Sequence, residues 1–238
     1  SVVHEGGHAL YELHVGRELS RTCLGGGVSM AIHESQSRFY ENIIGRSRAF
    51  CGIIYPWLRE HFAPRLDDVS QDAFYRMINK AQPSLIRTEA DELTYCLHIM
   101  VRYELERRMF AGELTAHDLP AQWNRLYKAY LGVDVPNDRE GILQDSHWAN
   151  GNIGYFPSYA IGSAYGAQYL RQMQKDFDVS AAVASGRLTQ INRWLEEKIW
   201  KYGCMKDPTP LFESVCGSFD PTCYTAYLRD KFTEVYGL

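Results

Sequence analysis

The strongest constraint on the fold of this chain is a pair of histidines near its start. His4 and His8 stand four residues apart in the segment VVHEGGHALYE. Side chains with this spacing share a face in an α-helix, so the pair predicts a helix that directs both imidazoles at one point. Two such nitrogens can bind one zinc ion at about 2.0–2.1 Å and leave a position for water. Glu5 completes an H-E-x-x-H pattern, in which the carboxylate takes a proton from that water.

A third ligand has to come from another part of the chain, and the segment AIHESQSRFYEN is the best candidate. Glu34 lies near the start of the next predicted helix, and two histidines with one glutamate form a known catalytic zinc arrangement. The neighbouring His33 is predicted to face the substrate or to support the site. Two simpler interpretations stay open. His4 and His8 can be ordinary helix residues, and Glu34 can be a first-turn carboxylate that interacts with the helix dipole.

Helical periodicity dominates the rest of the chain. Apolar residues at spacings of three, four and seven predict one long helix over 29–62 and another over 87–110. Asp118 and Gly132 are expected to bound a further helix. Later helices are predicted at 157–177, 188–202 and 221–236, and a short edge strand with a glycine turn is predicted within 21–30. The sequence therefore predicts one all-α unit over residues 1–238, with at most a small β element.

The composition excludes several classes of partner. The net charge of −4 at pH 7 provides no basic surface of the kind that binds nucleic acid or anionic membranes. No apolar run approaches the roughly 20 residues that span a bilayer. The first residues do not form a signal-peptide pattern. The six cysteines include no C-x-x-C pair, which is typical of reduced thiols and predicts a cytoplasmic protein.

Four motifs together point to a family. They are HEGGH at 4–8, HESQ at 33–36, IRTEAD at 86–91 and GILQDSHW at 141–148, and GYFPSYAIGSAYGAQ at 154–168 extends the match. In this order they resemble the family M32 metallocarboxypeptidases, the thermostable-carboxypeptidase-like enzymes. The resemblance implies a helical zinc-peptidase fold with a deep substrate groove. It also implies release of single amino acids from peptides with a free C-terminus, and a homodimer.

The resemblance also assigns roles to the metal-site residues. It implies that His4, His8 and Glu34 are the metal ligands and that Glu5 is the general base. The metal would be one divalent ion per chain, with Zn²⁺ expected first and Co²⁺ or Mn²⁺ as alternatives, because histidine and carboxylate ligands suit all three.

Further residues of the motifs are candidates for substrate binding. Arg87 of IRTEAD matches the position expected to hold the substrate carboxylate, for which a guanidinium is well shaped. The simpler interpretation is an ion pair with Asp91, four residues later on a predicted helix. Asp145 is expected to bind the substrate backbone or to orient a histidine that holds the metal.

A polar, glycine-broken segment near 144–156 is predicted to form an ordered loop at the active site. His147 and Tyr155 are the expected hydrogen-bond donors to the oxyanion that forms when water attacks the peptide carbonyl. Tyr159 competes with Tyr155 for this role.

The chain departs from the family pattern in one respect. The resembling enzymes are longer and carry H-P-F and D-x-R-x-T blocks before the H-E-x-x-H motif, and neither block occurs here. The expectation is therefore the C-terminal half of such an enzyme, with the N-terminal half absent, so that metal binding is weak and turnover poor. Two alternatives stay open: a dipeptidyl carboxypeptidase or oligopeptidase on a similar helical zinc fold, and a non-catalytic fragment.

Overall fold

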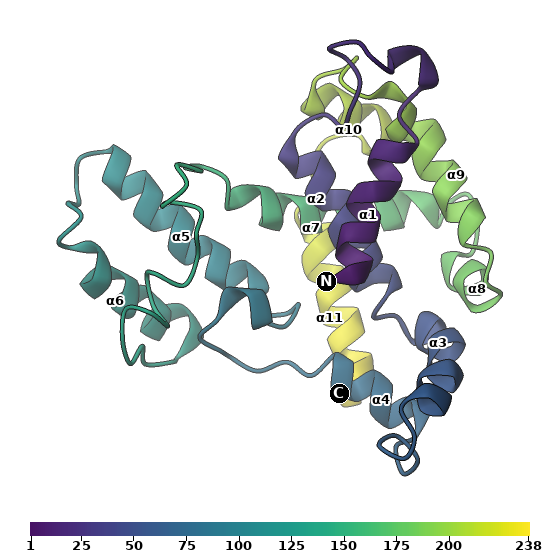
Figure 1. Cartoon of the computed structure of the whole chain (residues 1–238), viewed down its shortest axis with the longest axis horizontal. Coiled ribbons are helices and arrows are strands. Elements are labelled where there is room, and N and C mark those ends of the chain that lie inside the picture. The colour runs from purple at the N-terminus through teal and green to yellow at the C-terminus, as the bar shows by residue number, and fades with distance from the viewer. The chain divides into compact units, whose positions relative to one another are not determined.

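The computed structural model describes all 238 residues, and its regular elements are helices (Figure 1). The α-helices are α1 (Val2–Leu13), α2 (Met30–Arg38), α3 (Arg48–His61), α4 (Gln71–Ile78), α5 (Tyr95–Phe110), α6 (Leu119–Leu131), α7 (Pro157–Met173), α8 (Val179–Ala184), α9 (Leu188–Lys198), α10 (Pro208–Cys216) and α11 (Thr222–Tyr236). Short 3₁₀ turns lie at Arg17–Leu19, Arg87–Glu89 and Trp200–Tyr202, and a π-helical turn at Phe39–Ile44. The all-α prediction is confirmed. No helix is long and apolar enough to cross a membrane.

The edge strand predicted within 21–30 is wrong. The segment is a series of turns, and α2 begins at its last residue, Met30. Three consecutive glycines, Gly25 to Gly27, explain the difference, because glycine offers no side chain for a strand face. Gly26 has a φ of 96°, which bends the chain back toward α1.

The chain divides into two compact units. The first contains residues 1–79 and 161–238, and the second contains residues 80–160, so the boundary falls within α7. The first unit is thus built from two chain segments that are separated in the sequence. The expectation of a single domain over 1–238 stays a prediction.

The core of the first unit draws on both of its segments. Tyr11 and Ile32 from the first segment are completely buried with Tyr169 and Trp200 from the second. The indole Nε1 of Trp200 donates a hydrogen bond to Gln36 Oε1 on α2, at 2.8 Å. Burial of a large aromatic side chain contributes on the order of 1.5–3 kcal/mol, so the second segment stabilises the helices that carry the H-E-x-x-H and HESQ motifs.

Helix α2 approaches two neighbours closely at glycines. A Cβ added to Gly7 of α1 would lie 2.6 Å from the Ser37 Cα of α2. A Cβ added to Gly162 of α7 would lie 2.6 Å from the Glu34 Cβ. Both contacts involve the backbone or the first side-chain carbon, so these two positions require glycine. The second glycine of HEGGH therefore serves helix packing.

The single long helix predicted over 29–62 is interrupted. After α2 the chain forms the π-helical turn Phe39–Ile44, in which the Gly45 amide donates to Tyr40 O at 2.7 Å. A new helix, α3, then begins after Ser47, whose Oγ accepts from the Phe50 amide at 3.1 Å. The periodicity continues across the break, which is why it predicted one helix; the serine cap is the signal that marks the new start.

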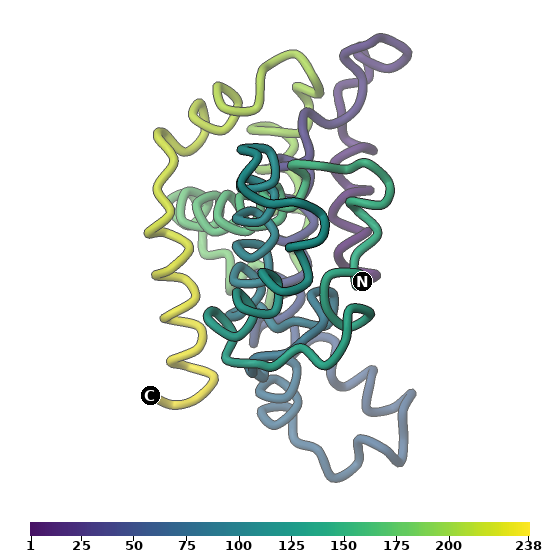
Figure 2. Tube along the Cα trace, turned by 90° about the vertical axis from the view of Figure 1, so that its left-hand side faces the viewer, coloured from purple at the N-terminus to yellow at the C-terminus, as the bar shows by residue number.

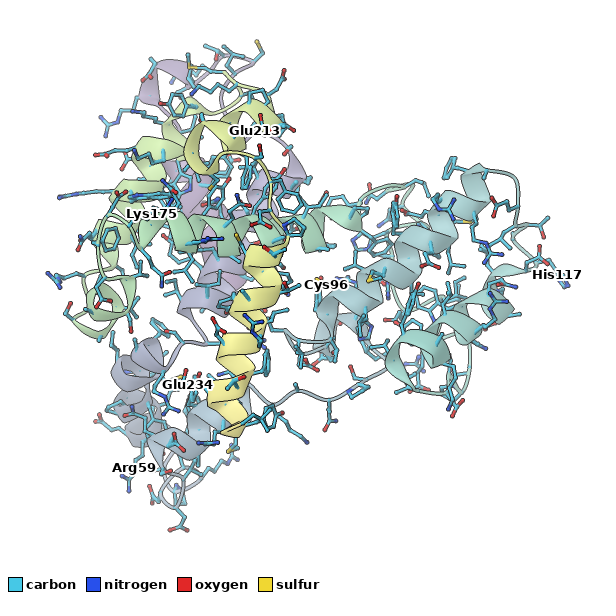
Figure 3. The ribbon with its side chains drawn as sticks, turned by 180° about the vertical axis from the view of Figure 1, so that it is seen from behind. Arg59, Cys96, His117, Lys175, Glu213 and Glu234 are labelled. Atoms are coloured by element: carbon cyan, nitrogen blue, oxygen red, sulfur yellow. The ribbon has the colours of Figure 1, made fainter.

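Helices α3 and α4 also contact each other and the last helix, α11, through charged side chains. Arg48, at the start of α3, pairs with Asp72 of α4 and with Glu234 of α11, at 2.6 and 2.5 Å. Figure 3 labels Glu234 on α11, and Figure 2 follows this last helix to the C-terminus. These charges are about half exposed, so each pair contributes at most about 1 kcal/mol.

The second unit contains α5 and α6, which pack around the buried residues Val101, Leu105, Trp123 and Tyr127. The helix predicted over 87–110 begins only at Tyr95. The helix begins this late because of Asp91. Its carboxylate accepts hydrogen bonds from the Thr94 amide and hydroxyl at 2.9 and 2.8 Å, which fixes the start of α5 directly after Thr94. Helix α6 ends as predicted at Gly132, with a φ of 72°.

Candidate metal centre

Three side chains from α1 and α2 converge in the first unit. Glu34 Oε2 lies 3.6 Å from His4 Nε2 and 3.9 Å from His8 Nε2. One ligand atom from each residue lies within 4.8 Å of the other two. The helix supplies the first two by its four-residue spacing, and the close approach of α1 to α2 at Gly7 brings the third.

The donor set fits a divalent metal ion. Ligand atoms of a tetrahedral site with bonds of about 2.1 Å stand about 3.4 Å apart, close to the two nitrogen–oxygen distances here. Glu34 is only 2% exposed, and its Oε2 also accepts from Ser37 Oγ at 3.0 Å. Two imidazoles and one carboxylate are a ligand set that catalytic zinc sites use, so these residues could hold such an ion. The fit agrees with the three ligands predicted from the sequence, whose role stays a prediction.

His4 is oriented by a carboxylate that the sequence analysis did not identify. Its Nδ1 donates to Glu41 Oε2 at 2.9 Å, which leaves Nε2 directed toward Glu34. Burial alone would raise the pKa of Glu41, but the His4 hydrogen bond and the charges of Arg38 and Arg46 lower it to about 2. Glu41 is therefore ionised at neutral pH and polarises His4, as carboxylates behind metal-binding histidines do.

His8 has a different neighbour. Its Nδ1 lies 3.1 Å from Nδ1 of His33, and His33 Nε2 lies 2.7 Å from Glu12 Oε1. Burial, together with the nearby His4 and His33, lowers the pKa of His8 to about 4. At neutral pH His8 is thus an uncharged imidazole, the form that binds a metal.

Glu5 lies on the same turn of α1 as His4. Its side chain is exposed, and no protein group forms a hydrogen bond or ion pair with its carboxylate. A general base needs such a carboxylate, because it has to accept a proton from water.

The remaining predicted residues belong to the second unit, where they form a cluster of their own. Arg87 is 6% exposed and donates from Nε and Nη2 to Asp145 Oδ1, at 2.9 and 2.7 Å, and from Nη1 to Tyr95 at 2.8 Å. The ion pair with Asp91, which was the simpler interpretation of Arg87, does not form; the acidic partner of Arg87 is Asp145. Three of the five guanidinium N–H donors are thus used inside the protein. Arg102 Nε donates to the other Asp145 oxygen at 2.7 Å.

His147, Tyr155 and Tyr159 lie together in this cluster. His147 Nε2 and the Tyr159 hydroxyl are 3.1 Å apart, and the ring centroids of His147 and Tyr155 are 5.3 Å apart. Burial, with the charges of Arg87 and Arg102 acting against that of Asp145, lowers the pKa of His147. The neutral ring can donate one hydrogen bond, as the predicted oxyanion role requires. The hydroxyl of Tyr159 is within hydrogen-bond distance of it.

The sequence analysis did not identify Glu12, Glu41 or Arg102 of these clusters, although two of the three had a detectable signal. Glu12 follows His8 by four residues, so His4, His8 and Glu12 share one helix face. Glu41 follows Glu34 by seven residues, about two helical turns. Arg102 had no such signal, because its contact with Asp145 depends on the loop 132–156.

Comparison with known proteins gives one consistent result. The family profile described as "Carboxypeptidase Taq (M32) metallopeptidase" matches residues 1–232. The curated protein "Carboxypeptidase 1" of Bacillus subtilis (strain 168) is 45% identical over 236 residues, which cover 98% of this chain and 47% of that protein. "Thermostable carboxypeptidase 1" of Pyrococcus furiosus is 44% identical over 234 residues, again with 98% and 47% covered.

Solved structures agree. The chain superimposes on the "M32 carboxypeptidase from Deinococcus radiodurans R1" with a TM-score of 0.96 and 42% identity, over 99% of this chain and 48% of that one. The chain thus spans about half the length of the curated relatives and structures that it matches.

Proposed function

Because this chain belongs to the carboxypeptidase Taq (M32) metallopeptidase family, we propose that it carries the metal centre of a carboxypeptidase. The reaction is hydrolysis of the C-terminal peptide bond of a peptide, with release of one amino acid. The observation that supports the proposal most directly is the convergence of His4, His8 and Glu34 beside an unpaired Glu5 carboxylate. A divalent ion held there supplies Lewis-acid chemistry and lowers the pKa of water.

The residues of the chain have separate roles in this proposal. His4, His8 and Glu34 hold the ion, with Zn²⁺ proposed first and Co²⁺ or Mn²⁺ as alternatives. Glu5 accepts a proton from the attacking water and passes it to the leaving amine nitrogen. Glu41 orients His4 through the 2.9 Å hydrogen bond.

The residues of the second unit enter the proposal through the family resemblance. Arg87 is proposed to recognise the substrate carboxylate and Asp145 to hold Arg87 in place. His147 is proposed to donate a hydrogen bond to the oxyanion, with Tyr155 or Tyr159 as the second donor. A homodimer and a cytoplasmic location are proposed on the same resemblance.

Metal content measured together with activity tests the proposal. The chain is incubated with Zn²⁺, Co²⁺ or Mn²⁺ and dialysed, and the bound metal is counted. The same samples are given an N-blocked peptide, and the products are identified by mass spectrometry. Glu5→Gln is compared with Glu18→Gln, a matched change of an exposed glutamate in the same unit. We expect one metal per chain, and slow release of single amino acids that Glu5→Gln abolishes and Glu18→Gln preserves.

Three other results would change the conclusion. Release of dipeptides would indicate a dipeptidyl carboxypeptidase. Activity that survives Glu5→Gln would exclude the proposed general base. A chain that binds no metal under any of these conditions would be a non-catalytic fragment.

A further inference from the structure

The two histidines of the metal centre are oriented in different ways. Nδ1 of His4 donates directly to a carboxylate, Glu41, at 2.9 Å. Nδ1 of His8 instead faces another imidazole nitrogen, Nδ1 of His33, at 3.1 Å. An imidazole can hold its neighbour in one tautomer only if its own tautomer is fixed, because each neutral ring has one donor and one acceptor nitrogen.

Glu12 fixes the tautomer of His33. Its Oε1 is 2.7 Å from His33 Nε2 and accepts a second hydrogen bond from the Gly27 amide at 2.8 Å. An ionised carboxylate only accepts, so His33 Nε2 must carry the proton. With that one proton on Nε2, the acceptor nitrogen of His33 is Nδ1, which faces His8.

The hydrogen bonds from Glu12 through His33 to His8 thereby fix which ring nitrogen of each histidine carries a proton. His8 Nδ1 has to be the donor, because His33 Nδ1 is an acceptor. The lone pair of His8 is consequently on Nε2, the atom that lies 3.9 Å from Glu34 Oε2. Both ring nitrogens of His33 have partners inside the protein, which suits the supporting role that was one of its two predicted roles.

We propose that Glu12 and His33 are positioning residues that hold His8 in the tautomer able to bind the metal through Nε2. The inference rests on the proposed metal centre and deepens it. Two hydrogen-bonded chains would then orient the two histidine ligands. One runs from Glu12 through His33 to His8, and the shorter one runs from Glu41 to His4.

The surrounding turn is shaped for this contact. A Cβ on Gly27 would lie 2.4 Å from His33 Nε2 and 2.6 Å from Tyr11 Cε1, so no larger residue fits beside the ring. The Tyr11 hydroxyl accepts from the Val28 amide at 3.1 Å, and its ring packs against His33 with centroids 4.8 Å apart. The His33 side chain is 13% exposed, whereas that of Glu12 is 48% exposed. The two hydrogen bonds on one oxygen therefore keep Glu12 in place against competition from water.

The first test reads the tautomers directly in the metal-free chain. With ¹⁵N-labelled histidine, long-range ¹H–¹⁵N correlations distinguish protonated from unprotonated ring nitrogens. We expect His8 protonated at Nδ1 and His33 protonated at Nε2, with a scalar coupling between the two Nδ1 atoms across their hydrogen bond. A His8 ring protonated at Nε2 would overturn the proposal.

The second test compares two near-isosteric variants of His33 and measures the zinc dissociation constant by chelator competition. His33→Asn keeps an acceptor oxygen close to the position of Nδ1, whereas His33→Leu removes it. We expect His33→Leu to raise the dissociation constant about 10–100-fold and His33→Asn to stay close to the unchanged chain. Equal affinities of the two variants would overturn the proposal.

Glu12 offers the corresponding pair. Glu12→Gln keeps an oxygen, because two N–H donors meet at this point and favour the amide oxygen there. Glu12→Ala removes it, and we expect the His8 signals to change to a mixture of tautomers. Unchanged tautomers in Glu12→Ala would contradict the role of Glu12. Glu18→Ala serves as the control for loss of an exposed glutamate.

The failure of this inference can be told apart from the failure of the proposed function. If the chain binds no metal but has the expected His8 and His33 tautomers, the hydrogen-bonded arrangement is supported and the proposed function is contradicted. If His33→Leu and His33→Asn bind metal equally well, the proposed metal centre is supported and the positioning role of His33 is contradicted.

Discussion

Glu34 and Glu41 stand seven residues apart, yet their carboxylates have different surroundings. Glu34 is buried and faces two imidazole nitrogens at 3.6 and 3.9 Å, with the Ser37 hydroxyl beside it. Glu41 is bound by Arg38 at 3.0 Å as well as by His4. Glu34 thus faces both histidines, whereas Glu41 contacts His4 at Nδ1, which fits the supporting role proposed for Glu41.

A second buried histidine, in the other unit, provides a test at the residue scale. His98 is completely buried, and its Nδ1 is 3.1 Å from the Tyr127 hydroxyl. Burial, with smaller effects of Arg102 and Arg87, lowers the pKa of His98 from 6.5 to about 3. Within this window the unfolded chain binds a proton that the native chain does not. The free energy of unfolding therefore decreases as the pH is lowered from about 6.5 toward about 3, by at most about 1.4 kcal/mol per pH unit for this group.

The variant His98→Asn isolates this effect, because it keeps an acceptor for the Tyr127 hydroxyl and removes the titrating ring. We expect the free energy of unfolding, measured with urea between about pH 7 and about pH 5, to depend less on pH in the variant. The same slope in both proteins would mean that His98 does not contribute to acid destabilisation. His117→Asn, at an exposed position shown in Figure 3, is the control.

At the scale of the elements, the contact between α1 and α2 depends on one of two adjacent glycines. A Cβ on Gly7 would meet Gln36 O and Ser37 Cα at 2.7 and 2.6 Å, whereas a Cβ on Gly6 would meet nothing within 4 Å. We expect Gly7→Ala to destabilise the chain by about 1–3 kcal/mol and Gly6→Ala to stabilise it by up to about 1 kcal/mol. Denaturant unfolding of both variants measures the difference. Equal stability of the two would contradict the backbone contact.

Most of the helices were predictable, because apolar periodicity reports which face of a segment is buried. The predictions failed where a side chain rather than periodicity decides an end. Ser47 begins α3, and Asp91 delays the start of α5. The convergence of His4 and His8 on one point followed from their spacing, and their role as ligands stays a prediction. The hydrogen bond between Arg102 and Asp145 could not be predicted, since it joins residues that are 43 positions apart and Asp145 lies in an irregular loop.

At the scale of the whole molecule, the metal centre depends on residues far along the chain. His4, His8 and Glu34 all lie in the first 34 residues, but Gly162, Tyr169 and other core residues that pack around α2 follow the second unit.

A fragment of residues 1–79 tests this dependence. It contains all three ligands and lacks the core side chains of α7 to α10, so we expect it to lack cooperative unfolding and to bind zinc much more weakly than residues 1–238. Circular dichroism during heating and chelator competition measure the two properties, with the whole chain in the same buffer as the reference. A cooperative transition with unchanged zinc affinity would show that the first segment folds by itself.

The glycine contacts on two sides of α2 also have a consequence for how the proposed metal centre would respond to ions of different size. Backbone atoms have no rotamers, so helices that meet at Gly7 and Gly162 cannot adjust by side-chain rotation. The spacing between the histidine pair and Glu34 is therefore mechanically stiff. A smaller ion with shorter bonds would have to be accommodated by tilting the ligand side chains, since these contacts block a closer approach of the helices. We therefore expect selectivity among divalent ions at the proposed centre to depend on backbone packing behind His4, His8 and Glu34 as well as on these three side chains.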